Sequence, residues 1–348
     1  MVEPSFPLPV KAKDKLRFDP VAKSVIVLLV KFATAVLVAC LCASCASNIV
    51  ALRYPTLADP AGCLVEQITS ETYDEYQVQG VSRDGRLLSF STNRGEDAEG
   101  NMLLEVYTLD LVTGTRTPLP ESINNSGNFS PDGEYLVVAA YDDNGRTEIL
   151  ELHLKSGNIT AIAPHEQWDW LPSYSADGRF IVFNSERHED QADIFLYERA
   201  TKKLQRLTHY TGYDAHAQFS PDGKRILFHR MNSKREDGGY DFDLYVYERQ
   251  SATLTRLTDG PYEESYAAFA PDGRYIVFSS DFEEAPEKHN LYIRAPDGGY
   301  TALTNGDWKD SYAYWTPDGK YIYFNSDRLG ITNIYRIPMQ GISCTRMG

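Results

Sequence analysis

Acidic and aromatic side chains recur at one position along the sequence, where together they could bind a ligand. Each carboxylate stands eight residues before the Asp of a repeated turn, or close to that position, and Trp side chains stand near Asp169 and Asp310. A carboxylate beside an aromatic ring suits sugars, cationic groups or an inserted peptide. The candidate binding residues are Asp74, Glu75, Trp168, Asp169, Trp170, Asp214, Glu264, Trp308 and Asp310.

A second interpretation gives the same carboxylates a structural role. Arginines follow the second strand expected in several repeats, at Arg94, Arg187, Arg230 and Arg328. An acid of one loop that pairs with an arginine of the other would fasten the two loops, and the pair would recur because the repeat recurs. The aromatic residues could likewise pack one repeat against the next. The sequence leaves both interpretations open.

Catalysis by these carboxylates is the alternative function. A glycosidase needs two carboxyl groups about 5–9.5 Å apart. The candidates for such a carbohydrate-active enzyme, a lyase or a glycosidase, are Asp169, Asp214, Glu264 and Asp310. The sequence contains neither a Gly-x-Ser-x-Gly nor a His-Glu-x-x-His motif. We therefore expect a binding protein with no catalytic residue, no metal and no cofactor.

The elements that must position these side chains are organised around a short repeated sequence motif. Its clearest copy contains Pro221, Asp222 and Gly223. Pro presets φ at about −65°, Asp can accept hydrogen bonds from the nearby backbone, and Gly tolerates a positive φ. Strand-like residues on both sides therefore predict a tight β-hairpin. The Asp residues of the six copies are Asp84, Asp132, Asp177, Asp222, Asp272 and Asp318. Two copies lack the Pro and have Arg83 or Ala176 in its place.

The spacing of the copies predicts the architecture. Successive turns are 45 to 50 residues apart, a period that with β-type residues indicates a propeller. Each repeat contains four strand-like segments, so we expect an all-β fold, a six-bladed β-propeller of four-stranded antiparallel blades. Leu64–Thr69 resembles the last strand of a repeat but precedes the first turn. It should pair with Asn333–Ile337 and close the ring, although Ile342–Met347 competes for that place.

This pattern resembles the TolB-type propeller repeat, in which an aromatic-Ser-Pro-Asp-Gly turn leads into Ile-x-Phe, Ser-Asp-Arg and Ile-Tyr. The stretch Trp315–Arg328, followed by Asn333–Tyr335, is a close copy. The resemblance covers Leu64–Met347 and implies a TolB-like propeller that serves as a binding or scaffold protein for a protein or peptide in the cell envelope. We expect no counterpart of the extra N-terminal domain of TolB, so a role in the Tol-Pal system is not implied.

The first residues have the composition of an export signal. Basic residues precede the apolar stretch Phe32–Ala39, and Leu-Val-Ala-Cys40 is similar to a bacterial lipobox. This predicts lipidation at Cys40, with Cys45 as the alternative. An uncleaved anchor over Ser24–Cys45 could also span the membrane, although Lys31 opposes insertion. We expect a lipoprotein-type signal or membrane anchor at 1–39, a linker at 40–62 and the propeller at 63–348. The protein would be exported to the bacterial periplasm and tethered to a membrane, as an outer-membrane lipoprotein.

Cysteine usage and net charge add two expectations. Outside the leader only Cys63 and Cys344 remain, and in an exported domain they would form a disulfide across the ring closure. Two separate free thiols are the alternative. The net charge of −15 repels phosphate backbones, so we expect no nucleic-acid partner. A saccharide is the alternative ligand of the acidic and aromatic candidate residues.

Overall fold

The computed structural model describes residues 54–70, 74–96, 102–123, 125–142, 145–188, 191–282 and 288–339. The chain divides into two units, residues 1–50 and 51–348, and all described residues belong to the second. The expected signal and the residues Cys40, Cys45 and Cys344 lie outside the described residues. Within these ranges the structure contains strands and no helix, and thus no helix that could span a membrane.

Three four-stranded antiparallel sheets each follow chain order. One contains β3 (Glu75–Val81), β4 (Leu87–Glu96), β5 (Met102–Asp110) and β6 (Arg116–Pro118). The next contains β7 (Gly127–Phe129), β8 (Tyr135–Tyr141), β9 (Thr147–His153) and β10 (Ile159–Ala161). A third contains β19 (Ser265–Phe269), β20 (Ile276–Ser280), β21 (Asn290–Arg294) and β22 (Tyr300–Ala302).

A larger sheet joins two further repeats. Its first antiparallel half contains β11 (Asp169–Tyr174), β12 (Phe180–His188), β13 (Gln191–Glu198) and β14 (Lys203–Arg206). Its second half contains β15 (Tyr213–Phe219), β16 (Arg225–Lys234), β17 (Tyr240–Glu248) and β18 (Thr253–Arg256). One parallel pair, Ala192 with Tyr213, connects the halves. The described strands therefore form five hydrogen-bonded sheets, so the expectation of six separate four-stranded sheets is met only in part.

The last sheet closes the ring with the beginning of the chain. β2 (Leu64–Gln67) pairs with β25 (Asn333–Pro338), which is followed inward by β24 (Tyr321–Ser326) and β23 (Asp310–Trp315). This pairing confirms the closure predicted for the segment that begins at Leu64. A fifth strand, β1 (Thr56–Ala58), lies in the stretch expected to be a linker and pairs with β2. Cys63 is buried and disulfide-bonded, but because Cys344 is not described, the pairing of these two residues stays a prediction.

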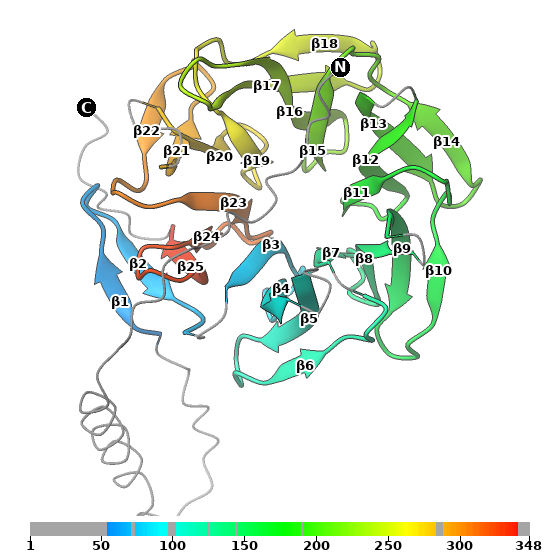
Figure 1. The fold of residues 1–348 in the computed structure, drawn as a ribbon, viewed down its shortest axis with the longest axis horizontal. Coiled ribbons are helices and arrows are strands. Elements are labelled where there is room, and N and C mark those ends of the chain that lie inside the picture. Colours follow the sequence, from blue (N-terminus) through cyan, green and yellow to red (C-terminus); the bar gives the residue numbers. More distant parts are fainter. Residues whose placement is uncertain are drawn as a thin grey trace, which may run out of the picture. The chain divides into compact units, whose positions relative to one another are not determined.

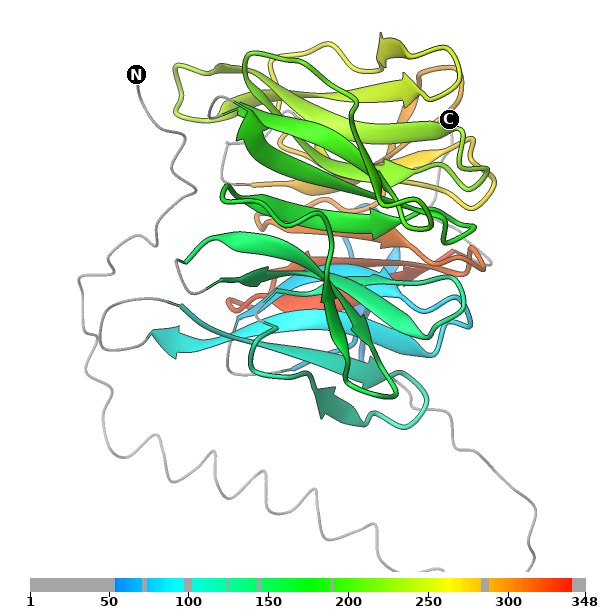
Figure 2. The ribbon, with the colours of Figure 1, turned by 90° about the vertical axis from the view of Figure 1, so that its right-hand side faces the viewer.

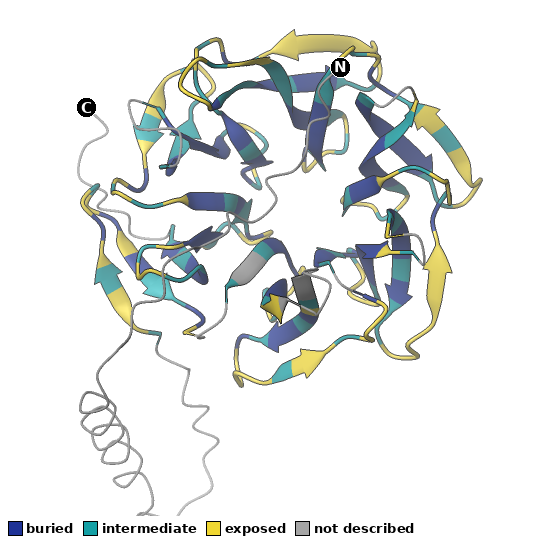
Figure 3. Cartoon of the chain, in the orientation of Figure 1, coloured by how far each residue is buried: buried dark blue, intermediate teal, exposed yellow. Residues whose placement is uncertain are grey.

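The sheets stand around a common centre, which confirms the all-β propeller. Strands β3, β7, β11, β15, β19 and β23 lie nearest that centre (Figure 1). The side view shows strands that run across the thickness of the ring, so that the hairpin turns emerge on its two faces (Figure 2). Burial falls from the inner strands to the outermost ones (Figure 3). The core consists of apolar clusters between neighbouring repeats, such as Val182 and Ile194 of β12 and β13 against Ile226 and Phe228 of β16.

The predicted turns are hairpins of one geometry. Each turn Gly has a φ between 68° and 73°, and its N–H donates to the carbonyl three residues earlier, as Gly223 does to Ser220 at 2.8 Å. Asp222 Oδ1 accepts from the Ser220 hydroxyl at 2.6 Å and from the Lys224 N–H at 3.1 Å. These bonds satisfy the polar groups of the turn and hold its residues in a fixed orientation.

Candidate functional site

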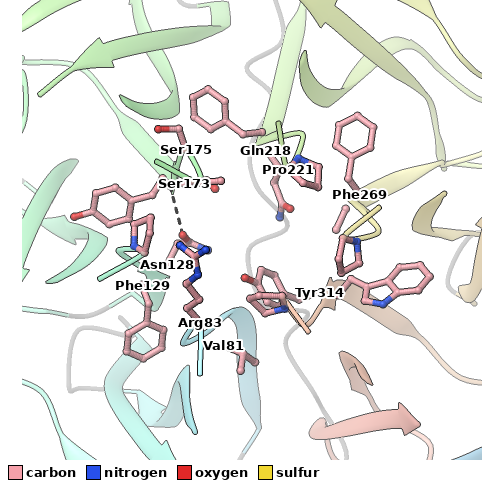
Figure 4. Close-up of a pocket in the computed structure, with 18 of the residues that line it drawn as sticks. Val81, Arg83, Asn128, Phe129, Ser173, Ser175, Gln218, Pro221, Phe269 and Tyr314 are labelled. Atoms are coloured by element: carbon pink, nitrogen blue, oxygen red, sulfur yellow. Dashed lines mark hydrogen bonds between the residues drawn. The ribbon is translucent and has the colours of Figure 1, made fainter. Parts of the chain in front are cut away.

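A pocket of about 300 Å³ opens at the face of the propeller that carries these turns (Figure 4). Its lining residues come from all six repeats, from Val81 to Pro317, so the pocket lies on the common centre of the sheets. This volume is at the lower end of the range of ligand pockets in proteins. The predicted site residues Asp169 and Asp310 begin their inner strands, and the pocket lies at the other end of these strands, where they lead into the turns.

Two positions of the repeat supply much of the lining. The residues immediately before the turn Asp form an outer ring of Arg83, Pro131, Ala176, Pro221, Pro271 and Pro317. The residues four positions before it form an inner ring of Asn128, Ser173, Gln218, Ala268 and Tyr314. Gly80 has the inner-ring position in the first repeat, where a Cβ atom would lie 3.2 Å from Asn128 Cα. A larger residue there would displace the Asn128 backbone.

Irregularities in the inner strands orient the inner ring. The register shifts between Trp170 and Ser173, and equivalent shifts precede Gln218, Ala268 and Tyr314. A bulge of this kind bends its strand and redirects the side chains that follow. The residues inside the shifts have positive φ without being Gly: Leu171 (51°), His216 (56°), Tyr266 (49°) and Tyr312 (53°), with Gln77 (50°) in the first repeat. Such backbone is costly and concentrates at functional sites.

The side chains of four of these strained residues, Gln77, His216, Tyr266 and Tyr312, pack together. The ring centroids of Tyr266 and Tyr312 are 4.1 Å apart, and His216 lies 5.4 Å from Tyr266. Gln77 Nε2 donates to Tyr312 Oη at 3.1 Å, which joins the first and last repeats. Burial lowers the pKa of His216 to about 4, so its imidazole is neutral near pH 7. His216, Tyr266 and Tyr312 each stand two positions before an inner-ring residue, so the inner strands next to the ring are joined by neutral side chains.

Three of the predicted carboxylates lie away from the pocket, and each is held by an arginine of its own sheet. Asp169 Oδ2 is 2.7 Å from Arg187 Nη2, Asp214 accepts two bonds from Arg230 at 2.6 and 2.8 Å, and Asp310 accepts from Arg328 at 3.0 and 3.1 Å. All three Asp residues have no exposed surface. Burial raises the pKa of Asp169 to about 6, against the opposing effect of Arg187. The geometry is that of the loop-fastening interpretation.

The remaining predicted residues do not converge on one cavity either. Glu264 is buried, and Trp170 is buried against Tyr213. Trp308 Nε1 donates to Asp310 Oδ2 at 3.2 Å, and Asp74 Oδ1 accepts from the Thr332 N–H at 3.0 Å. The side chain of Glu75 lies outside the described residues. Trp168 retains 36% exposed surface. None of these residues lines the pocket.

A family model described as the TolB beta propeller domain matches residues 80–285, more than half of the chain. The chain belongs to this family. Among curated relatives, the Tol-Pal system protein TolB of Francisella tularensis subsp. mediasiatica (strain FSC147) is 29% identical over 206 residues, which cover 53% of this chain and 45% of that protein. The TolB of the holarctica strain OSU18 is 33% identical over 81 residues, 23% of this chain and 18% of that protein. The chain thus spans less than half the length of these TolB proteins.

Solved structures of TolB and of an enzyme share the fold. TolB from Acinetobacter baumannii aligns with a TM-score of 0.55 and 19% identity over 82% of this chain and 63% of that one. The structure described as putative TolB from Agrobacterium tumefaciens aligns with a TM-score of 0.58 and 20% identity. The alignment covers 78% of this chain and 93% of that one. An oligogalacturonate lyase in complex with manganese aligns with a TM-score of 0.54 and 16% identity. The alignment covers 83% of this chain and 96% of that one. At these identities the similarity establishes the fold alone.

The signal for the pocket is present in the TolB-type repeat. Both rings stand at fixed offsets from the turn Asp, just as the predicted acids do. Residue type alone favours the acids, because carboxylates and Trp residues are typical of ligand sites, whereas Pro with Asn, Ser and Gln is common in any loop. Among the described residues of this TolB-type propeller, no group of three or more His, Cys, Asp or Glu side chains could hold a metal ion.

Proposed function

We propose that this chain is an exported, membrane-tethered TolB-like propeller that acts as a binding or scaffold protein in the cell envelope. Its partner would be a protein or peptide that inserts a short segment into the pocket at the turn face. The single observation that carries this proposal is the convergence of both residue rings, one position from each repeat, on one pocket of about 300 Å³.

The chemistry of the pocket suits a peptide segment. Pro side chains of the outer ring give it apolar walls, and the inner ring adds the amides of Asn128 and Gln218 and the hydroxyl of Ser173. A mostly apolar wall with a few convergent polar groups is typical of ligand sites. Asn128 is itself held between neighbouring repeats, because it donates to Gln79 O at 3.3 Å and accepts from the Tyr174 N–H at 3.4 Å. A rigid site of this kind loses little conformational entropy on binding.

We also infer the number of blades, the membrane attachment and the disulfide of this propeller. The two antiparallel halves of the eight-stranded sheet would count as two blades, which makes the ring six-bladed, in agreement with its six turns. Lipidation at Cys40, or at Cys45, would hold the propeller at the periplasmic side of the outer membrane. A disulfide between Cys63 and Cys344 would join the two ends of the propeller, and the disulfide-bonded state of Cys63 supports it.

Site-specific crosslinking in cells tests the pocket. A photoreactive amino acid at Gln218, in the full-length chain, should capture a discrete envelope protein or peptide. Ser173→Trp, which places an indole in the inner ring, should reduce this capture by about tenfold or more, equivalent to roughly 1.4 kcal/mol of binding free energy. The readout is the yield of the crosslinked species.

Two matched controls make that result specific. The same photoreactive residue at Thr253, on the exposed outer strand β18, should capture no such species. Ala161→Trp, on the exposed strand β10, should leave capture at Gln218 unchanged. Equal capture from Gln218 and Thr253, no capture from either, or capture insensitive to Ser173→Trp would refute binding in the pocket.

A further inference from the structure

The pocket contains one charged side chain among its described lining residues, that of Arg83. Arg83 has the position at which four other turns have Pro and one has Ala176. A Pro there presets the turn, as noted above, so replacing it by Arg gives up that local preference. The remaining lining residues are uncharged. The departure from the repeat therefore places a single positive charge in an otherwise neutral pocket.

The Arg83 guanidinium is available to a ligand. Arg83 is exposed, and it forms no ion pair with any residue that the structure describes. Figure 4 shows Arg83, Gln218 and Tyr314 directed toward the same central space from three different repeats. The Gln218 side chain likewise makes no hydrogen bond to a described residue. The pocket thus contains two kinds of hydrogen-bond donor, the charged guanidinium of Arg83 and the neutral amide of Gln218.

The other charges at this face do not occupy the pocket. The turn Asp residues are absent from the lining. Backbone N–H groups hold them and, in five of the six turns, so does a Ser or Thr hydroxyl, as at Asp84, where Ser82 Oγ lies at 2.6 Å. In five of the six turns a basic residue follows the Asp by two positions: Arg86, Arg179, Lys224, Arg274 and Lys320. These bases offset the charge of the rim. A carboxylate that entered the pocket would meet Arg83 as its nearest lining charge.

We propose that the pocket recognises a carboxylate of the inserted peptide, with Arg83 as its principal donor and Gln218 as a second one. This inference rests on the proposed function, since it names the chemistry of the segment that the same pocket binds. A guanidinium presents a planar fork that matches both oxygens of a carboxylate, and such charge-assisted bonds are stronger than neutral ones. With a net charge of −15, the protein does not attract an acid over long range, so recognition depends on this local contact.

Affinity selection from random tetrapeptide libraries tests the inference. The full-length chain, purified in a mild detergent, is mixed with one library of free C-termini and one of amidated C-termini, and retained peptides are read by mass spectrometry. Retained peptides should be richer in carboxylates than the starting libraries. Enrichment confined to the free C-termini identifies the terminal carboxylate as the recognised group, and enrichment of Asp or Glu in both libraries identifies the side chain.

Variants of Arg83 then connect the carboxylate to the guanidinium. Arg83→Gln should lower the affinity for the best retained peptide by about tenfold, and removal of the peptide's carboxylate should have the same effect. The two changes together should lower the affinity no further than either one alone. Arg83→Lys, which keeps the charge without the fork, should lie between the two. Arg83 is exposed, so folding is expected to be unaffected.

The outcomes separate this inference from the proposed function. Suppose that the chain retains peptides and that Ser173→Trp loses them. If these peptides are no richer in carboxylates than the libraries, or if Arg83→Gln retains them equally well, the inference is overturned and peptide binding stands. Retention of no peptide above the level of Ser173→Trp would overturn both.

Discussion

Arg328→Met is expected to lower the free energy of unfolding by about 3–5 kcal/mol, because it leaves buried carboxylates without their cation. The Arg328 side chain is 4% exposed and lies 3.0 Å from Asp310 Oδ2 and 3.3 Å from Asp59 Oδ2. Asp310 begins the innermost strand of the last sheet, while Asp59 follows β1 at the start of the described chain. Arg328 therefore fastens the segment that closes the ring.

Chemical denaturation of the full-length chain measures this effect. The matched control is Arg179→Met, since Arg179 forms an ion pair with Glu198 at 3.6 Å but its side chain is 65% exposed. Exposed pairs contribute about 0–1 kcal/mol, so this control should change the unfolding free energy little. Equal effects of the two variants would contradict the assigned role of Arg328.

Neutralising the two carboxylates that Arg328→Met leaves unpaired should restore part of the lost free energy of unfolding. Asp310→Asn and Asp59→Asn, combined with Arg328→Met, leave neutral amides where the single variant leaves two buried acids. Asp59 Oδ1 also accepts from the N–H groups of Ala61 at 2.9 Å and Asn305 at 2.8 Å, and an amide oxygen can keep these bonds. The triple variant should thus be more stable than Arg328→Met. If it were less stable, the loss would come from packing of the guanidinium on neighbouring rings such as Trp308, 4.8 Å away.

The fold was largely predictable because its determinants are local and repeated. Pro221, Asp222 and Gly223 specify a turn by their own backbone preferences, and five relatives at near-constant spacing specify a ring. The closure by the segment that begins at Leu64 followed from the same counting. The sheet boundaries were less predictable, since the merger of two sheets depends on one parallel contact, Ala192 with Tyr213. No residue type signals such a contact.

The site was less predictable because one residue pattern allowed two physical outcomes. Asp214 and Arg230 stand at corresponding positions whether they bind a ligand or each other, and only the paired register of β15 and β16 brings them together. The pocket depends on bulges in the inner strands, which place Tyr266 and Tyr312 in a left-handed conformation that their residue type does not favour. Arg83 was visible in the sequence as a departure from the repeat, but its meaning required the location of the pocket.

One repeat lacks the arginine that its acid would need, and this gives a second large effect. Glu264 has the position of Asp310, and Phe282 has that of Arg328, as Ser280-Asp281-Phe282 and Ser326-Asp327-Arg328 show. Glu264 is 4% exposed, and its Oε2 atom has no hydrogen-bond partner among the described residues. Burial raises the pKa of Glu264 to about 7, and the nearby Asp243 contributes in the same direction.

Glu264 should therefore make the protein less stable as the pH rises from about 4.5 to about 7. In this window the unfolded chain releases the Glu264 proton while the folded chain retains it, so the unfolding free energy falls with pH. The shift from the ordinary value of 4.5 to about 7 corresponds to a loss of about 3 kcal/mol. Glu264→Gln keeps a neutral side chain of the same shape, so it should be more stable than the parent by about 2–3 kcal/mol at pH 8 and within about 1 kcal/mol of it at pH 4.5.

Denaturation of the parent and the variant across pH 4.5–8.5 isolates this residue, because the difference between the two curves cancels the other titrating groups. Glu134→Gln is the matched control: Glu134 follows the turn of the second repeat, is exposed, and should give a flat difference curve. A flat curve for Glu264→Gln as well would mean that the folded chain ionises Glu264 as readily as the unfolded one. In that case the missing arginine would be compensated by solvent or by groups such as Thr258, and the absence of a cation at this position would have no effect on stability.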